Sequence, residues 1–155
     1  MIYDMKPFLQ QCVQAYLTAS KKESTSLKYA ATPFIDEGRL TPDEEVPNGA
    51  LQPIASSILM NILYAARMAR FDLLKAVSAL AKCVTKWSTN CDKRLHRLVC
   101  YIHSSLDLYL RGHIGDRRSD LKLSLYSDAD FAGDKSDSTS TTGIFLALKI
   151  GRAHV

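Results

Sequence analysis

The chain has 155 residues, enough for one domain or two partial ones, and apolar residues make up 46% of it. That proportion supports a hydrophobic core and excludes a disordered chain. The formal net charge of +4 permits a nucleic-acid partner but does not by itself indicate one.

The cysteines and the N-terminus bear on where the protein works. None of the four cysteines forms a Cys-x-x-Cys pair and the histidines do not complete a zinc-ligand spacing, so we expect reduced, mostly buried thiols. Asp4 and Lys6 interrupt the N-terminus before any apolar run of the kind that a secretory signal needs. The most apolar segment, residues 54–68, is too short to span a bilayer. We therefore expect an intracellular protein, cytoplasmic or nuclear, without a membrane partner.

The first predicted element is an N-terminal helix within residues 1–20. It begins near Pro7, a favourable residue for a first turn, and Asp4 can cap it. Its apolar residues recur at helical spacing. Residues 21–50 are rich in proline and glycine, so we expect an irregular linker there.

Three further helices are predicted over residues 52–67, 72–86 and 92–104, each with apolar residues at helical spacing. Together they make a helical segment, residues 51–105. Trp87 ends an apolar stripe in this segment, and we expect it in the core rather than on a base-stacking surface.

Strands follow the helices. Apolar and polar residues alternate loosely over 106–114, which predicts a strand. We expect residues 115–120 to form a turn and residues 122–127 to form the second strand of a hairpin. Residues 143–148 make a further strand. Helices first and strands last predict the α+β class, with residues 106–149 as its strand-rich part.

The most informative stretch is Tyr126-Ser-Asp-Ala-Asp-Phe-Ala-Gly-Asp-Lys135. It places Asp128 at the end of a strand, with Asp130 and Asp134 close behind. Carboxylate oxygens at a strand end suit Mg²⁺, which binds through a few carboxylates together with substrate phosphate. The residues alone leave open a plain turn, in which the aspartates accept local backbone N–H bonds.

This stretch and the following Ser138-Thr-Ser-Thr-Thr-Gly143 resemble the opening of the ribonuclease H domain of copia-type retrotransposon polyproteins. Residues 52–80 are similar to the segment that links reverse transcriptase to ribonuclease H in that family, with Arg70-Phe-Asp72 where Arg-Pro-Asp is usual. The polymerase signature Tyr-x-Asp-Asp is absent.

The resemblance implies a parent protein that hydrolyses the RNA strand of RNA–DNA hybrids during reverse transcription, with Mg²⁺ as the cofactor. It implies that Asp128 is the first catalytic carboxylate and bridges two metal ions. Asp130 lies on the same face of the strand by its spacing and is a weaker metal-ligand candidate.

The sequence also predicts a fragment that is inactive by itself. No Asp or Glu follows Asp137, whereas two-metal hydrolysis needs several carboxylates around ions about 3.5–4 Å apart. Residues 106–149 are therefore expected to be an incomplete ribonuclease H-like domain, partnered by the remainder of a polyprotein. Residues 150–155 break the strand pattern and match one reading frame of a common sequencing-adapter DNA, so we expect a non-native tail.

Basic residues gather on the last two predicted helices. Lys93 and Arg97 lie one turn apart with Arg94 beside them, and Lys82 and Lys86 form a second such pair. They are weak candidates for a surface that contacts the phosphates of a hybrid duplex, and a solvated helix face is the alternative. Two other functions stay open: a non-catalytic nucleic-acid-binding remnant, and a structural remnant that binds nothing.

Overall fold

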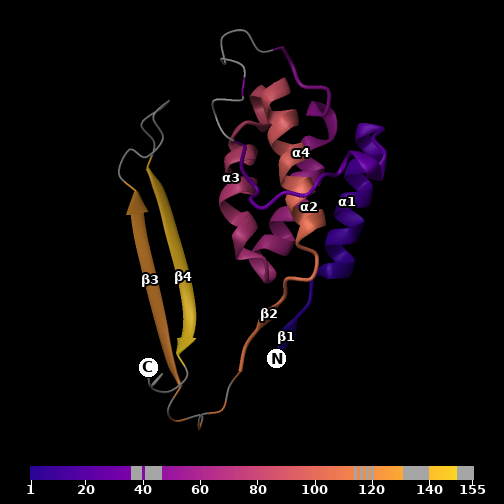
Figure 1. The fold of residues 1–155 in the computed structure, drawn as a ribbon. Coiled ribbons are helices and arrows are strands. Elements are labelled where there is room, and N and C mark those ends of the chain that lie inside the picture. The colour runs from indigo at the N-terminus through magenta and orange to yellow at the C-terminus, as the bar shows by residue number, and fades with distance from the viewer. Residues whose placement is uncertain are drawn as a thin grey trace. The chain divides into compact units, whose positions relative to one another are not determined.

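The structure is a computed structural model, and it describes residues 1–35, 40, 47–113, 115, 117, 119, 121–130 and 140–149. Over these residues the fold is of the α+β class, with four α-helices and two small antiparallel sheets. The chain divides into two compact units, Met1–Arg111 and Gly112–Val155. Figure 1 shows that the helices belong to the first unit and the long strands β3 and β4 to the second.

Helix α1 (Lys6–Ser20) forms where the sequence predicts it. The Asp4 carboxylate accepts a hydrogen bond from the Lys6 backbone N–H at 2.8 Å and so satisfies one donor of the first turn. Lys21 ends the helix in the left-handed conformation, with φ of 53°, and the backbone N–H groups of Lys21 and Lys22 bond back to the last turn.

Helix α2 (Gln52–Met68) also agrees with its prediction. The residues before it, Ala50 and Leu51, donate their backbone N–H groups to the Asp92 carboxylate at 2.7 and 3.3 Å. Asp92 lies in the first turn of α4 (Thr89–Ser104), so a distant helix supplies the acceptor for the start of α2. The same carboxylate accepts the Trp87 indole N–H at 2.6 Å, which fixes Trp87 against this junction.

The single helix predicted over residues 72–86 is wrong in its extent. The structure has a 3₁₀ turn (Phe71–Leu73), the short helix α3 (Leu74–Lys82) and a second 3₁₀ turn (Val84–Lys86). At the C-terminal end of α3, the Cys83 N–H donates to the Leu80 carbonyl oxygen at 3.0 Å. A bond to the carbonyl three residues back is typical of a 3₁₀ turn, so the α-helix ends here. Helix α4 starts three residues before the predicted position.

The helices share one hydrophobic core. Helix α1 packs against α2 and α4, and α3 packs against the same two helices. Trp87 is 1% exposed, as predicted for a core residue. The four cysteines are free and three of them are buried, which agrees with the prediction of reduced, mostly buried thiols. In the described part of the chain, no helix combines the length and apolar character needed to cross a membrane.

The strand predicted over residues 106–114 is mostly absent from the described residues of that range, 106–113. Among them β2 (Leu110–Arg111) is the part that forms a strand, and it pairs with β1 (Ile2–Tyr3) rather than with residues 122–127. The alternation of apolar and polar residues in this stretch is too loose to predict which strand pairs with it. A pairing of two residues is too short to produce a periodic pattern in the sequence. The hairpin predicted between residues 106–114 and 122–127 is therefore wrong.

Strands β3 (Lys122–Asp130) and β4 (Thr141–Lys149) form an antiparallel hairpin in the second unit. Both strands were predicted, although each is longer than expected. Their register pairs Leu125 with Leu146 and Asp128 with Gly143. Because side chains alternate along a strand, one face of the hairpin carries five large apolar side chains together with Ser127 and Thr142. The five apolar side chains are between 44% and 71% exposed: Leu123, Leu125, Ile144, Leu146 and Leu148.

Candidate functional site

Asp128 lies near the end of β3, as the sequence predicts, and is exposed. Side chains alternate along a strand, so Asp128 shares its face with Tyr126 and lies on the opposite side from the leucines. Its partner in the register is Gly143, which has no side chain. A Cβ added at Gly143 would meet only the Asp128 carbonyl oxygen, at 3.9 Å, so no side chain stands directly across the strand from this carboxylate.

The same face of the hairpin carries an aromatic pair and a cation. The rings of Tyr126 and Phe145 lie 6.4 Å apart between centroids, and the Lys149 ammonium lies 5.4 Å from the centre of the Tyr126 ring. Cross-strand pairs of this kind stabilise a hairpin and hold its register. The register of β3 is thereby fixed close to Asp128.

The other predicted metal ligands are not brought to Asp128 by the described residues. Asp130 pairs with Thr141 at the end of the hairpin where the chain connects the two strands, and its side chain, like Asp134 and residues 150–155, lies outside the described residues. In the part of the chain that the structure describes, no group of three or more His, Cys, Asp or Glu side chains could hold a metal ion. One exposed carboxylate does not fit a pair of magnesium ions by itself.

The predicted basic residues lie on three elements: Lys82 at the end of α3, Lys86 in the second 3₁₀ turn, and Lys93, Arg94 and Arg97 on α4. Lys93 and Arg97 line a pocket in the first unit, whereas Lys82, Lys86 and Arg94 are not among its lining residues. Arg97 donates to the Thr32 carbonyl oxygen at 2.9 Å and to the Thr32 hydroxyl at 3.3 Å, so part of its guanidinium holds the chain after α1. The role of these residues as a phosphate-contacting surface stays a prediction.

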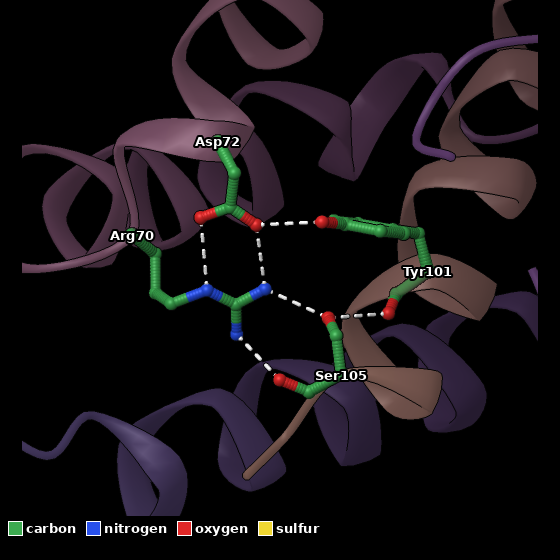
Figure 2. A network of polar contacts seen from close by, with 4 residues as sticks. All are labelled: Arg70, Asp72, Tyr101 and Ser105. Carbon is green, nitrogen blue, oxygen red and sulfur yellow. Dashed lines mark hydrogen bonds and ion pairs between the residues drawn. The ribbon is translucent and has the colours of Figure 1, made fainter. Parts of the chain in front are cut away.

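Sequence reasoning missed a buried polar network at the start of α3 (Figure 2). The Arg70 side chain is 2% exposed and binds the Asp72 carboxylate with two hydrogen bonds, at 3.0 and 2.8 Å. It also donates to the backbone carbonyl and the hydroxyl of Ser105, at 2.9 and 2.7 Å. The Tyr101 hydroxyl donates to Asp72 at 2.9 Å, so the network joins the start of α3 to the end of α4.

The electrostatics of this network favour its charged form. Burial by itself raises the pKa of Asp72, but the hydrogen bond and charge of Arg70 and the Tyr101 hydroxyl outweigh it, and the net pKa is lowered. Arg70 has its donors directed at Asp72 and Ser105 inside the protein. The network is therefore a structural clamp and not a site for a ligand.

The thiol of Cys91 has a lowered pKa but is buried. The Cys83 thiol, the hydrogen bonds at Ser88 and the charge of Arg94 lower the pKa of Cys91, against the effect of burial. The Ser88 hydroxyl lies 3.5 Å from its sulfur. However, Cys91 is only 4% exposed, so a substrate does not reach it in this structure.

Comparisons with family models, with curated proteins and with solved structures found no match to this chain.

Proposed function

We propose that this chain is part of a copia-type retrotransposon polyprotein, carrying a helical connection segment and the opening hairpin of its ribonuclease H-like domain. The parent activity would be hydrolysis of the RNA strand of an RNA–DNA hybrid. The observation that supports this best is the position of Asp128, which is exposed near the end of β3 and faces a glycine across the strand.

The geometry around Asp128 suits a residue that contributes one ligand to a larger site. Its carboxylate lies on the face opposite the leucines, so the apolar face can be covered while the carboxylate stays accessible. The glycine opposite leaves room beside the carboxylate for an ion or a substrate phosphate. Because the described residues do not fit two magnesium ions, the proposal assigns the remaining ligands to carboxylates outside them.

The proposal predicts that the 155-residue chain does not cleave an RNA–DNA hybrid in magnesium or manganese. Followed past Leu148, the genomic reading frame should encode further acidic residues, and the extended protein should cleave the RNA strand with added magnesium. Asp128→Asn should abolish that cleavage, because an amide cannot replace a bridging carboxylate.

Asp107→Asn provides the matched control, since Asp107 is also an exposed aspartate but belongs to the first unit. An extended protein that cleaves equally well with Asn at position 128, or a reading frame that adds no acidic residue, would overturn the proposal. Cleavage by the 155-residue chain itself, lost in Asp128→Asn, would overturn the assignment of the other ligands.

A further inference from the structure

Two cysteine thiols lie together where α3 ends and α4 begins. Cys83 follows the last residue of α3, and Cys91 lies in the first turn of α4. A hydrogen bond joins their side chains, and the short segment 84–90 separates them in sequence. Neither takes part in a disulfide bond. The first unit therefore holds two reduced sulfurs within reach of each other.

The two thiols differ in their access to solvent. Cys83 is half-buried, and its sulfur lies 3.6 Å from the Ala79 carbonyl oxygen in the last turns of α3. Cys91 is buried, so a molecule in solution does not reach its sulfur directly. A reagent in solution therefore meets Cys83 first, and the Cys83 sulfur is the group that brings the reaction to Cys91.

The surroundings of Cys91 stabilise its thiolate. The hydrogen bond with Cys83 is the largest of the effects that lower the pKa of Cys91. The hydrogen bonds at Ser88 and the charge of Arg94 lower this pKa further, and burial opposes them. The first turn of α4 adds the positive end of a helix dipole. Cys12 is the contrast, because burial raises the pKa of its thiol to about 11.

We propose that Cys83 and Cys91 form a reversible thiol–disulfide site, which reacts with a low-molecular-weight disulfide such as oxidised glutathione. Cys83 is the residue that is modified first. Cys91 then displaces the attached thiol and forms an internal disulfide with Cys83. The proposal concerns the first unit alone and is independent of the role given to Asp128.

The exchange takes place in two displacement steps. In the first, Cys83 loses its proton to the solvent and its sulfur attacks one sulfur of oxidised glutathione. The S–S bond of the glutathione breaks, and one glutathione leaves and takes up a proton. In the second step, the Cys91 thiolate attacks the Cys83 sulfur, and the second glutathione leaves and takes up a proton. Two protein thiols are thus oxidised to a disulfide while one oxidised glutathione is reduced to two thiols.

The test is incubation of the reduced and folded full chain with oxidised glutathione, followed by an acid quench and by alkylation of the remaining thiols in denaturant. The products are digested with trypsin and identified by mass spectrometry. Lys86 lies between the two cysteines, so trypsin places them in separate peptides, residues 83–86 and 87–93. We expect these two peptides to be joined by a disulfide bond, which dithiothreitol should break again.

The other two cysteines serve as internal references in the same experiment. Cys12 and Cys100 are buried, so both should be recovered as alkylated thiols and not as glutathione adducts. A disulfide bond that involves either of them would overturn the proposal.

Two single variants separate the roles of the thiols. Cys91→Ala should stop the reaction at the mixed disulfide, so that the chain gains one glutathione at Cys83 and forms no internal disulfide. Cys83→Ser should prevent both products, because the remaining thiols are buried. Cys12→Ala is the matched control, since it also removes one buried thiol, and it should form the internal disulfide to the same extent as the unmodified chain.

The unmodified chain decides the proposal even if a variant does not fold, which circular dichroism detects. A lasting glutathione adduct on Cys83 of the unmodified chain, as abundant as in Cys91→Ala, would overturn the role of Cys91 and with it the proposal. Equal modification of folded Cys83→Ser, or no reaction of the folded unmodified chain, would overturn it as well.

Discussion

The structural role of Arg70 is the one that is hardest to predict from the sequence. Its triplet resembles a family motif in which a proline starts the helix, and here a phenylalanine stands in the proline's place. The structure shows a different reason for the arginine and the aspartate: they form a bidentate ion pair that also holds Ser105. The Arg-x-Asp spacing is visible in sequence, but Ser105 lies 35 residues further along the chain, and no local pattern links the two.

We predict that Arg70→Ala lowers the free energy of unfolding by about 2–3 kcal/mol. The substitution removes a buried guanidinium, so the Ser105 carbonyl loses its side-chain donor and Asp72 keeps only the Tyr101 hydroxyl as a side-chain donor. The loss should stay below that of a fully buried pair, because the Asp72 side chain is 33% exposed and water can reach it. Urea denaturation followed by Trp87 fluorescence measures it.

Tyr101→Phe is the companion variant, since it deletes one hydrogen bond to Asp72 and keeps the ring. It should cost about 1 kcal/mol. A loss for Arg70→Ala no larger than that for Tyr101→Phe would contradict the role of Arg70 as the centre of the network.

His96 gives the first unit a predictable dependence on pH. Burial, and then the charge of Lys22, lower its pKa from the ordinary value of 6.5, so the folded protein favours the neutral ring. A lowered pKa means that the related stability is present above pH 6.5 and is lost as the pH falls through the folded value. Tyr16 beside it does not titrate in this window, since its pKa is raised to about 12.

The unfolding free energy should therefore fall as the pH is lowered below the ordinary histidine pKa of 6.5, and His96→Gln should make that fall shallower. Glutamine is neutral throughout and can still accept the Tyr16 hydroxyl. His103→Gln is the control, because His103 is exposed on the same helix. Equal slopes in the His96 variant and the unmodified chain would exclude His96 as the source.

At the scale of elements, the junction between α2 and α4 depends on a close approach of two backbones. Asn48 and Ser88 form an isolated antiparallel bridge, and the Gly49 N–H donates to the Trp87 carbonyl at 3.1 Å. A Cβ at Gly49 would lie 2.5 Å from the Ser88 carbonyl oxygen and 2.6 Å from a Trp87 ring carbon. The sequence predicted only an irregular linker at this glycine, because its neighbours in space lie some forty residues away.

Gly49→Ala should destabilise the first unit by about 1–3 kcal/mol, the usual cost of forcing extra atoms into a packed region. Thermal denaturation followed by circular dichroism and by Trp87 fluorescence measures the change. Gly112→Ala serves as the reference, since a Cβ there meets nothing within 4 Å. Equal midpoints for the two alanine variants would contradict the close approach at Gly49.

At the scale of the whole molecule, the sequence predicted the helices better than the pairing of strands. Residues such as Leu9, Leu59 and Leu95 are buried because periodic apolar spacing determines which face of a helix meets the core. Which strands pair depends on contacts between residues that are distant in sequence. The predicted partner of β2, residues 122–127, was therefore wrong, and β2 pairs with β1. Asp128 was proposed as a site residue from a local motif. The pocket beside α4, in contrast, is lined by residues of the segment after α1 as well as by α4, and no local pattern predicts it.

The two units should differ in their resistance to amide hydrogen exchange. The helices α2 and α4 bury one face in the core, whereas a two-stranded hairpin is marginal in water, and Leu123 and Ile144 are 69% and 71% exposed. We expect slow exchange in α2 and α4 and fast exchange in β3 and β4, measured at several protein concentrations to detect association through strand edges. Strong protection of Leu123, Leu125 and Phe145 in a monomer would contradict this expectation.

The pairing of β1 with β2 brings the two ends of the first unit together. Ile2 lies opposite Arg111, and paired strands run about 4.8 Å apart, so the first and last residues of this unit are separated by little more than one strand spacing. A short glycine-rich link could close residues 1–111 into a circle without bending either strand. New ends could then be opened in the exposed stretch after α1, giving a circularly permuted protein in which the order of the helices changes while their neighbours in space stay the same.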